Sequence, residues 1–588
     1  MTQRPSPIVG IDLGTTYSAI ALYEGGRVRF FPNPLGQDLT PSVVAWDRRS
    51  QGMVVGRQAR DILATRPGDA AALFKREMGR DISLRIGDRS FTPVELSAWV
   101  LDSLRADAER ALGCAVTRCV VTVPAYFNEA QRFATKRAAE TAGFSVERVL
   151  NEPTAAAIAY GLHGGVTDGA AATSAVVEDA EERRFLVFDL GGGTFDVCVM
   201  ERFEGMLEVR SVAGESRLGG EDFTEALVQF ALEQAGLDAD KVAREQPDEL
   251  ALVRKRAEVV KRTLSRWPKA ELLLPEALGS QVVGISQAAF ERATAALRER
   301  MVGPCRTALR SAGLNLADLQ EILLVGGATR MPGVHAFITE VFNRPPLLGP
   351  DPDRVVAHGA AIQAALCADD QAVSDLVVTD VASHSLGVEV TREIAGKRLA
   401  GFFSPIIHRN TVIPASKVEV YQTVQDGQRA IDLEIYEGEA RRVQDNHRLG
   451  VLAIKNLPKR DAGTDFAVRF TFDLNGILEV EASVEGVEQR FSQIFQREGK
   501  VLDAAELMRA KERIRGLKAD PHERPRYRDV LTRADLLWRE LPAGQKPMLD
   551  HAIDSFEAAL RGKDTKAIET AFGDLNQLCE RLGGSERW

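Results

Sequence analysis

The spacing of hydrophobic and polar residues changes along the chain and divides it into three parts. Up to about residue 368, short apolar runs end in glycine-rich turns that lead into helical segments. Beyond residue 382 the period becomes two, because Ile431, Leu433 and Ile435 alternate with polar residues as in a strand with one buried face. From residue 503 the period is helical again. The pattern predicts an α/β part, an all-β part and a short helical part.

Shorter signals refine this division. The alternation continues over residues 468–472, and the Asn475-Gly476 pair that follows predicts a hairpin turn. Residues 164–182 are rich in small and acidic residues and predict a surface loop. Residues 376–378, Leu-Val-Val, form an isolated apolar island between acidic residues. By itself this island is equally consistent with a short edge strand and with a separate linking segment.

Two turns of nearly the same sequence lie 177 positions apart, GIDLGTTY at residues 10–17 and FDLGGGTFD at residues 188–196. Each places an aspartate, Asp12 or Asp189, at the end of a strand-like run, where it can hold a metal ion or a water. The glycines let the backbone approach a phosphate, and the threonine hydroxyls and free N–H groups suit phosphate oxygens. Two such turns facing each other would hold a nucleotide from both sides. If the repeat marks a duplicated unit, its second copy would end near residue 365.

Composition excludes several classes of protein. The 588 residues are too many for one core. A net charge of -10 argues against non-specific nucleic-acid binding. No apolar run approaches the roughly 18 residues of a membrane span, and no signal-peptide core follows Met1. The six cysteines form no C-x-x-C pair and fit small buried hydrophobic residues. We therefore expect a cytoplasmic protein that binds neither nucleic acid nor membrane.

Further candidate residues have an ordinary interpretation when each is taken singly. Lys75 could offset charge on a phosphate or be a surface lysine. Glu152 precedes Pro153 at a helix start, where an acid is common. Residues 219–223 predict a glycine turn that enters a helix. An exposed, ion-paired helix face is predicted for Glu258, Lys261, Arg262 and Ser265. Residues 323–332 predict a strand followed by a double-glycine anion site.

In their order along the chain, these motifs resemble the nucleotide-binding domain of the seventy-kilodalton heat-shock, DnaK-type chaperone family, within the actin and hexokinase superfamily. The resemblance covers nearly the whole chain and implies a multidomain protein. Its parts are an actin-like α/β ATPase domain of duplicated ribonuclease H-like units at 1–368, a linker at 369–381, a β-sandwich substrate-binding domain at 382–500 and an α-helical lid at 501–588. The trimmed second lobe and short tail resemble the HscC branch.

The resemblance implies an ATP-dependent chaperone that binds extended apolar segments of unfolded or client proteins. Hydrolysis of ATP to ADP would switch an open, fast-exchange state to a closed, slow-exchange state. A J-domain co-chaperone would stimulate hydrolysis, and a nucleotide exchange factor is a further expected partner. Mg²⁺ would be held by Asp12 and Asp189, largely through water, and K⁺ would lie near the phosphates.

The resemblance also assigns roles to residues of the nucleotide site. Lys75 and Glu152 would position the attacking water, with Thr194 near the γ-phosphate. Arg262 and Arg330 would sandwich the adenine, and Ala328 departs from a hydrogen-bonding residue often found there. The implied ATP-binding residues are Gly14, Thr15, Thr16, Tyr17, Gly191, Gly192, Gly193, Thr194, Gly220, Glu221, Glu258, Lys261, Arg262, Ser265, Gly326, Gly327, Arg330 and Asp353.

Three other sets follow from the same resemblance. The interdomain switch would comprise Pro124, Arg132, Leu376, Val377, Val378 and Asp380. J-domain docking would use Arg148, Asn151, Thr154 and Glu321. The peptide groove would be lined by Phe402, Tyr421, Ile431, Leu433, Ile435 and Ile477, for which ordinary sandwich core is the alternative. The chain departs from the family in carrying Ala-Ser-His at 382–384, and its segment after Glu389 is longer than usual.

Two other functions use the same phosphate turns. A sugar kinase of the superfamily would need a catalytic aspartate on a substrate loop, and none is evident. A filament-forming actin relative or scaffold would have no use for the linker island and the β part. Phosphorylation of a sugar panel and light scattering with ATP distinguish these alternatives from a chaperone.

Overall fold

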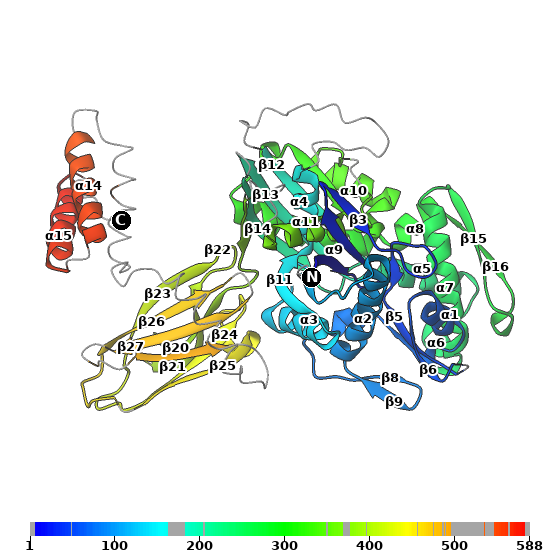
Figure 1. Ribbon diagram of the computed structural model, residues 1–588, viewed down its shortest axis with the longest axis horizontal. Helices are drawn as coiled ribbons and strands as arrows, with labels where there is room; N and C mark the ends of the chain where they lie inside the picture. The colour runs from blue at the N-terminus through cyan, green and yellow to red at the C-terminus, as the bar shows by residue number, and fades with distance from the viewer. Residues whose placement is uncertain are drawn as a thin grey trace.

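The computed structural model describes residues 6–582 except 49, 163–182, 204–205, 348–350, 369–376, 395–396, 456, 474–475, 485–486, 488–489, 496–533, 535–545 and 563–564. In Figure 1 the α/β part lies to the right, the β-rich part at lower left, and the C-terminal helices at upper left. The loop expected at residues 164–182 lies outside the described residues.

The first sheet has the strand order β11-β10-β1-β2-β3, with β4 paired to β2. Its strands are β1 (Ile8–Leu13), β2 (Tyr17–Glu24), β3 (Arg27–Phe30), β4 (Thr40–Pro41), β10 (Arg118–Val123) and β11 (Ser145–Asn151). Around it lie α1 (Arg57–Thr65), α2 (Pro93–Leu112), α3 (Glu129–Thr141), a small sheet of β5 (Val43–Asp47), β6 (Gly52–Val55) and β7 (Ala70–Ala72), and a hairpin of β8 (Leu84–Ile86) and β9 (Arg89–Phe91). Local chemistry sets the helix starts, since Thr92 with Glu95 and Asn128 with Gln131 form capping boxes.

The second sheet repeats this arrangement in the order β17-β12-β13-β14-β18. Its strands are β12 (Arg183–Leu190), β13 (Phe195–Phe203), β14 (Met206–Glu215), β17 (Glu321–Val325) and β18 (Val377–Val378). Its helices are α5 (Gly220–Gln234), α6 (Ala239–Glu245), α7 (Pro247–Leu264), α8 (Gln287–Ala293), α9 (Ala295–Ala312) and α10 (Pro332–Phe342), with a hairpin of β15 (Lys269–Leu273) and β16 (Val282–Ser286). In both sheets the aspartate-bearing strand, β1 or β12, runs parallel to one neighbour and antiparallel to the next strand in sequence.

Helices α4 (Glu152–Leu162) and α11 (Val355–Cys367) pack together between the two sheets. The contact is close, since a Cβ on Gly359 would lie 1.7 Å from the carbonyl oxygen of Ala155. A Cβ on Gly10 of β1 would lie 2.1 Å from the backbone nitrogen of Ala361. Glycine at these positions lets α11 approach both α4 and the first sheet, and so holds the two phosphate turns in a common frame.

The β-rich part consists of two four-stranded antiparallel sheets. One has the order β21-β20-β24-β25, with β20 (Leu386–Ile394), β21 (Lys397–Ile407), β24 (Ile431–Glu437) and β25 (His447–Ile454). The other has the order β23-β26-β27-β28, with β23 (Ala415–Gln422), β26 (Asp465–Phe472), β27 (Leu478–Val484) and β28 (Arg490–Phe495). One apolar core joins them. The sequence places a turn between β26 and β27, where Gly476 has a φ of +76°.

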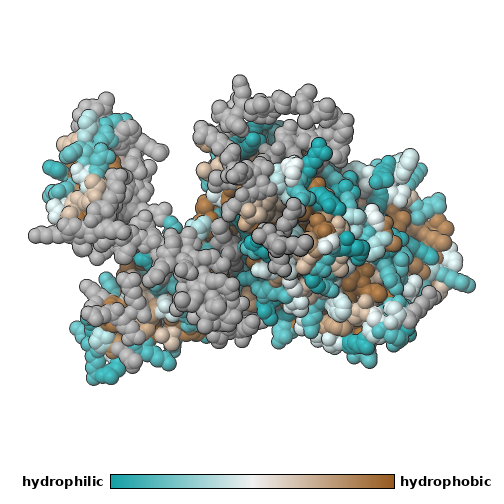
Figure 2. All heavy atoms as spheres, viewed as in Figure 1, coloured by the Kyte–Doolittle hydropathy of each residue, from teal (hydrophilic) through white to brown (hydrophobic). Residues whose placement is uncertain are grey.

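Two C-terminal helices, α14 (Lys546–Gly562) and α15 (Thr565–Leu582), pack on each other around Phe556 and Leu575. Pro547 lies in the first turn of α14, where proline is tolerated. Hydrophilic side chains cover much of the face seen in Figure 2, with apolar patches on the α/β part. Within the described residues, no helix is long and apolar enough to cross a membrane.

The α/β and β-rich parts touch along β14, α3 and α9. Strand β18 extends the second sheet in parallel with β14, and β19 (Asp380–Val381) then pairs with β22 (Val412–Ile413) of the β-rich part. The backbone N–H of Glu129, at the start of α3, donates to the Glu437 carboxylate at 3.2 Å. The Glu129 side chain also abuts Gly476 of the β26–β27 turn. The structure is therefore one in which the β-rich part is docked.

Candidate nucleotide site and interdomain switch

The two repeated turns lie against each other. A Cβ on Gly192 would fall 1.8 Å from Oγ1 of Thr16, and a Cβ on Gly193 would fall 2.5 Å from Cγ2 of Thr15. The backbone of Gly192 and Gly193 in turn approaches Gly219, at the entry of α5. Glycine at these positions lets the two turns approach this closely, because a Cβ would collide with the opposite turn.

Lys75 and Glu152 meet beside these turns. Lys75 lies in a 3₁₀ turn (Phe74–Glu77) and Glu152 begins α4, yet Nζ of Lys75 lies 2.5 Å from Oε1 of Glu152. Lys75 is only 2% exposed, and its Nζ also lies 5.8 Å from the ring centroid of Phe127. The surface-lysine alternative is therefore wrong. The buried ion pair holds both charged groups in one position. A side chain that orients a water molecule must be held in this way.

Three aspartates surround this ion pair. Asp12 accepts a 3.3 Å hydrogen bond from Thr122, and Asp196 accepts one of 3.0 Å from the backbone N–H of Tyr126. Burial, followed by the charge of Glu152, raises the pKa of Asp12 to about 7 and that of Asp196 to about 8, and it raises the pKa of Asp189 well above its usual value. Burial and the charge of Glu152 thus favour the neutral form of these carboxyl groups, and a bound cation would favour their charged form.

The residues present fit a divalent cation. Oδ2 of Asp189 is buried and has no hydrogen-bond partner. Within the part of the chain that the structure describes, no cluster of three acidic, histidine or cysteine side chains forms a complete metal site. Two aspartates with the remaining positions left to water and phosphate oxygens suit Mg²⁺, which keeps much of its hydration shell.

Helix α7 supplies an ion-pair network on the other side of the turns. Lys261 is buried, and its Nζ donates to the Gly220 carbonyl and to Thr224 at 2.7 Å and pairs with Glu258 at 2.6 Å. Although burial raises the pKa of Glu258, the charges of Lys261 and Arg262 lower it to about 2. Glu221 accepts a 3.4 Å hydrogen bond from Thr16 and so joins the network to the first turn. Because Lys261 is buried, the interpretation of this helix face as an exposed, ion-paired surface is wrong for Lys261.

The two arginines expected around adenine are each held by acidic side chains. Arg262 pairs with Glu258 at 2.8 Å and stacks 5.6 Å from the ring centroid of Tyr17. Arg330, in a 3₁₀ turn (Gly327–Arg330), pairs with Asp351 and Asp353. Gly326 has a φ of +82°, and Gly327 lies directly against the Asp353 carboxylate. Ser265 caps the end of α7. Both arginines are therefore held by carboxylates, and their place on either side of an adenine stays a prediction.

Several residues of the site were not identified from the sequence. Arg76 donates to the Gly193 carbonyl at 3.0 Å and pairs with Asp222 at 2.5 Å, so it joins the two halves. Arg60 donates to the Tyr17 hydroxyl. Asp196 ends the second repeated turn, and Arg76 directly follows Lys75, so proximity to the motifs was the only signal available.

A buried polar chain connects α3 to the linker. Nη1 of Arg132 donates to Oδ1 of Asn151 at 2.5 Å, and Nδ2 of Asn151 donates to both carboxylate oxygens of Asp380 at 2.8 and 2.9 Å. Pro124, at the end of β10, is buried close to this chain. Val377 and Val378 add to the edge of the second sheet, whereas Leu376 lies outside the described residues.

The expected J-domain residues are not one exposed surface in this arrangement. Asn151 and Thr154 are 1% and 0% exposed, because Asn151 is enclosed by the linker contact and Thr154 lies inside α4. Arg148 donates to Gln363 at 3.0 Å, and Glu321 pairs with Arg183 at 3.3 Å. In the docked state, burial therefore prevents Asn151 and Thr154 from contacting a partner directly, which corrects the expectation for these two residues.

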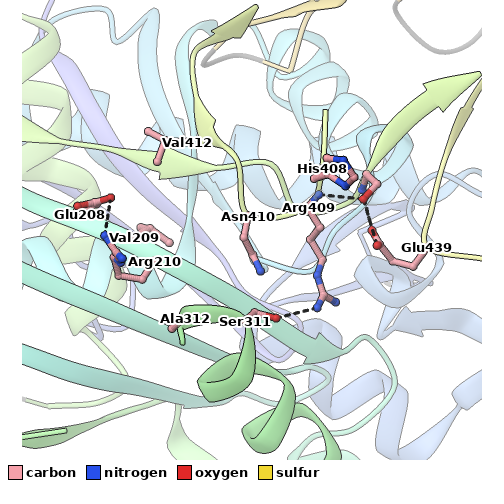
Figure 3. Close-up of a pocket in the computed structure, with 11 residues that line it drawn as sticks. Glu208, Val209, Arg210, Ser311, Ala312, His408, Arg409, Asn410, Val412 and Glu439 are labelled. Atoms are coloured by element: carbon pink, nitrogen blue, oxygen red, sulfur yellow. Dashed lines mark hydrogen bonds and ion pairs between the residues drawn. The ribbon is translucent and has the colours of Figure 1, made fainter. Parts of the chain in front are cut away.

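A polar cavity of about 550 Å³ lies where the two parts meet, as Figure 3 shows. Arg409 crosses it and donates to Ser311 at the end of α9 at 3.2 Å, while Asn410 accepts from the Val212 backbone at 3.1 Å. Next to it, the ring of His384 packs 4.8 Å from that of Tyr126. Burial, then the charges of Arg409 and Arg132, lowers the pKa of His384 to about 4. The departure from the family at residues 382–384 thus lies at the interface.

The expected groove residues separate into two groups. Leu433 and Ile435 belong to the core between the two sheets, and Tyr421 and Ile431 are partly buried against it. Phe402 and Ile477 are 1% and 2% exposed. Their position does not distinguish a closed groove from sandwich core, so their role stays a prediction.

Comparison with known proteins agrees with this architecture. The family model described as "Hsp70 protein" matches residues 8–86 and 81–585. The chain is 36% identical over 608 aligned residues to the "Chaperone protein DnaK" of Thermotoga neapolitana, and the alignment covers 99% of this chain and 98% of that protein. The six cysteines are all free in the structure, and four are buried. The chain therefore belongs to the Hsp70 family and is an ATP-hydrolysing chaperone of the DnaK type.

Proposed function

We propose that this chain binds extended apolar segments of client polypeptides and that ATP controls how fast they exchange. The observation that carries this proposal is the continuous path from the nucleotide turns to the β-rich part. Strand β18 completes the second sheet, and Asn151 joins Arg132 to Asp380 immediately after it. A change in the angle between the sheets would strain this path and release the β-rich part.

Hydrolysis rests on positioning and charge. Lys75 and Glu152 orient the attacking water, and Thr194, which is 6% exposed between the two turns, lies near the γ-phosphate. Asp12 and Asp189 would hold Mg²⁺ largely through water, and the ion would supply positive charge against the phosphate oxygens. Glu221, Glu258 and Lys261 hold the sugar side of the nucleotide. K⁺ near the phosphates remains part of the proposal.

The coupled states follow from the docked arrangement. With the β-rich part held against β14 and α3, peptide would exchange rapidly, and after hydrolysis the released part would hold peptide longer. A J-domain co-chaperone would stimulate the switch near Arg148, and a nucleotide exchange factor would speed ADP release. The HscC-like branch and a cytoplasmic location also stay proposals. Family membership sets aside the sugar-kinase and filament alternatives.

The decisive experiment measures dissociation of a fluorescent, unstructured apolar peptide from the full chain, first with ADP and then after ATP is added. We expect ATP to accelerate release, because the coupling between two such sites is typically about 1–3 kcal/mol. A release rate that is the same with ADP and with ATP, or no binding across a peptide library, would contradict the proposal. The β-rich part would then be a docking platform for a folded partner.

A further inference from the structure

Three arginines converge on one buried aromatic ring of the β-rich part. The guanidinium carbon of Arg442 lies 3.9 Å from the ring centroid of Phe402, and those of Arg441 and Arg392 lie at 5.4 and 5.5 Å. Phe402 itself is 1% exposed. We refer to Arg392, Arg441 and Arg442 as the arginine cluster. Their side chains lie over this ring and cover part of it with their aliphatic stems and guanidinium groups.

The arginine cluster is held by the backbone around it. Residues 441–442 run along the open edge of β21, since the N–H of Phe403 donates to the Arg441 carbonyl at 3.0 Å and Phe402 bridges to Arg442. Nη1 of Arg442 donates to the Ala400 carbonyl at 3.2 Å. Arg392 projects from β20, where it faces Leu399 of β21. Strand β20 thus supplies the third guanidinium at the ring.

The charge of the cluster is not neutralised locally. Within the described part of the chain, no carboxylate lies at ion-pair distance from Arg392, Arg441 or Arg442, whereas Arg448 of the same sheet pairs with Glu434 at 3.1 Å. Of the two acidic residues on β20, Glu389 accepts from the N–H of Gly401 at 2.9 Å, and Glu393 lies opposite Arg398 of β21. Across residues 389–402 and 441–442, five basic side chains face two acidic ones.

Exposed apolar residues adjoin the arginine cluster. Leu399 is 41% exposed and Val424 is 39% exposed, although both are large hydrophobic residues. Arg398 donates to the Val424 carbonyl, which ties the β20–β21 hairpin to the loop after β23. Tyr421 of β23 donates to Ser404 at 3.2 Å, on the same face of β21 as Phe402. Exposed Leu399 therefore lies opposite Arg392 on the neighbouring strand, and Arg398 holds exposed Val424 to the same hairpin.

We propose that the arginine cluster and these exposed apolar residues select extended client segments in which acidic side chains flank an apolar stretch. This inference deepens the proposed peptide-binding function and rests on it. The apolar side chains of the segment would cover Leu399 and Val424, while its carboxylates would accept hydrogen bonds from Arg392 and Arg441, which are exposed. Arg442, already bonded to the backbone, would keep Phe402 covered. Carboxylate and guanidinium form the strongest class of side-chain hydrogen bond.

The test uses three fluorescent peptides with the same leucine- and valine-rich centre, flanked on both sides by aspartate, glutamine or lysine. Binding to the full chain with ADP is followed by anisotropy. We expect the aspartate-flanked peptide to bind about three- to fivefold more tightly than the glutamine peptide, as for an exposed ion pair. The preference should fade between about 0.1 and 1 M salt, where the screening length falls from about 10 to 3 Å.

Variants separate charge from structure. The double variant Arg392→Gln with Arg441→Gln should abolish the preference for aspartate and leave the glutamine peptide unaffected. Arg392→Lys with Arg441→Lys should retain the preference, and so should Arg460→Gln, which changes an exposed arginine elsewhere in the β-rich part.

Three results would overturn the inference. The first is equal binding of the three peptides, which leaves the proposed function intact. The second is a preference for the lysine peptide. The third is binding of a single-stranded oligonucleotide that the glutamine variants lose, because the cluster would then serve nucleic acid. No binding of any peptide would instead remove the proposed function together with this inference.

Discussion

Replacing Lys75 by alanine tests the chemistry assigned to the nucleotide site. Lys75 is the cation paired with Glu152 amid three aspartates, and its ammonium is almost completely buried. The variant keeps both phosphate turns and the α7 network, on which nucleotide binding depends. We therefore expect ATP binding to be retained and hydrolysis to be lost.

The magnitude follows from burial. Loss of one preorganised charge in a dry site typically costs about 2.7–4 kcal/mol of transition-state stabilisation, which is roughly a 100- to 1,000-fold loss of rate. Removing one partner of a buried pair also lowers the free energy of unfolding by about 3–5 kcal/mol.

The assay is single-turnover hydrolysis of pre-bound ATP, with nucleotide affinity and thermal unfolding measured on the same sample. Lys269→Ala, which changes an exposed lysine of the β15 strand, is the matched control and should leave the rate unchanged. Hydrolysis at the parental rate by a Lys75→Ala protein that binds ATP normally would refute the role given to Lys75. Loss of both binding and hydrolysis would point to a structural role instead.

Three further predictions concern the coupling between the parts. Val377→Asp with Val378→Asp should remove peptide stimulation of the ATPase because charge is unfavourable at the sheet edge beside β14; stimulation that survives would contradict the linker role. Asn151→Ala should weaken docking by about 1–3 kcal/mol for each buried polar group that it leaves unpaired, and energy transfer between probes on the two parts would report this loss or its absence. Burial raises the pKa of Glu129 to about 7 in the docked state, so docking should weaken as pH rises from about 4.5 towards 7. His384 has the opposite effect: because its pKa is lowered to about 4 in the docked state, docking should weaken as pH falls below about 6.5. The variant Glu129→Gln should therefore keep only the weakening of docking at low pH. A variant whose docking depends on pH as the parent's does would contradict the role given to Glu129.

The sequence by itself determined the features that depend on neighbouring residues. An aspartate followed by glycine and threonine identified both phosphate turns, and the period-two alternation identified the β-rich part before its sheets were known. The duplication was also readable, because each copy carries its own turn. These signals are local: backbone conformation and one-sided burial are set within a few residues of chain.

Only the tertiary structure decided which distant residues meet. Lys75 reaches Glu152 across 77 positions, and Asn151 reaches Asp380 across 229. Arg76 and the arginine cluster around Phe402 had no local signal, since an arginine on a surface and one in a site are alike in sequence. Contacts between remote residues depend on strand order and register, which no local pattern contains.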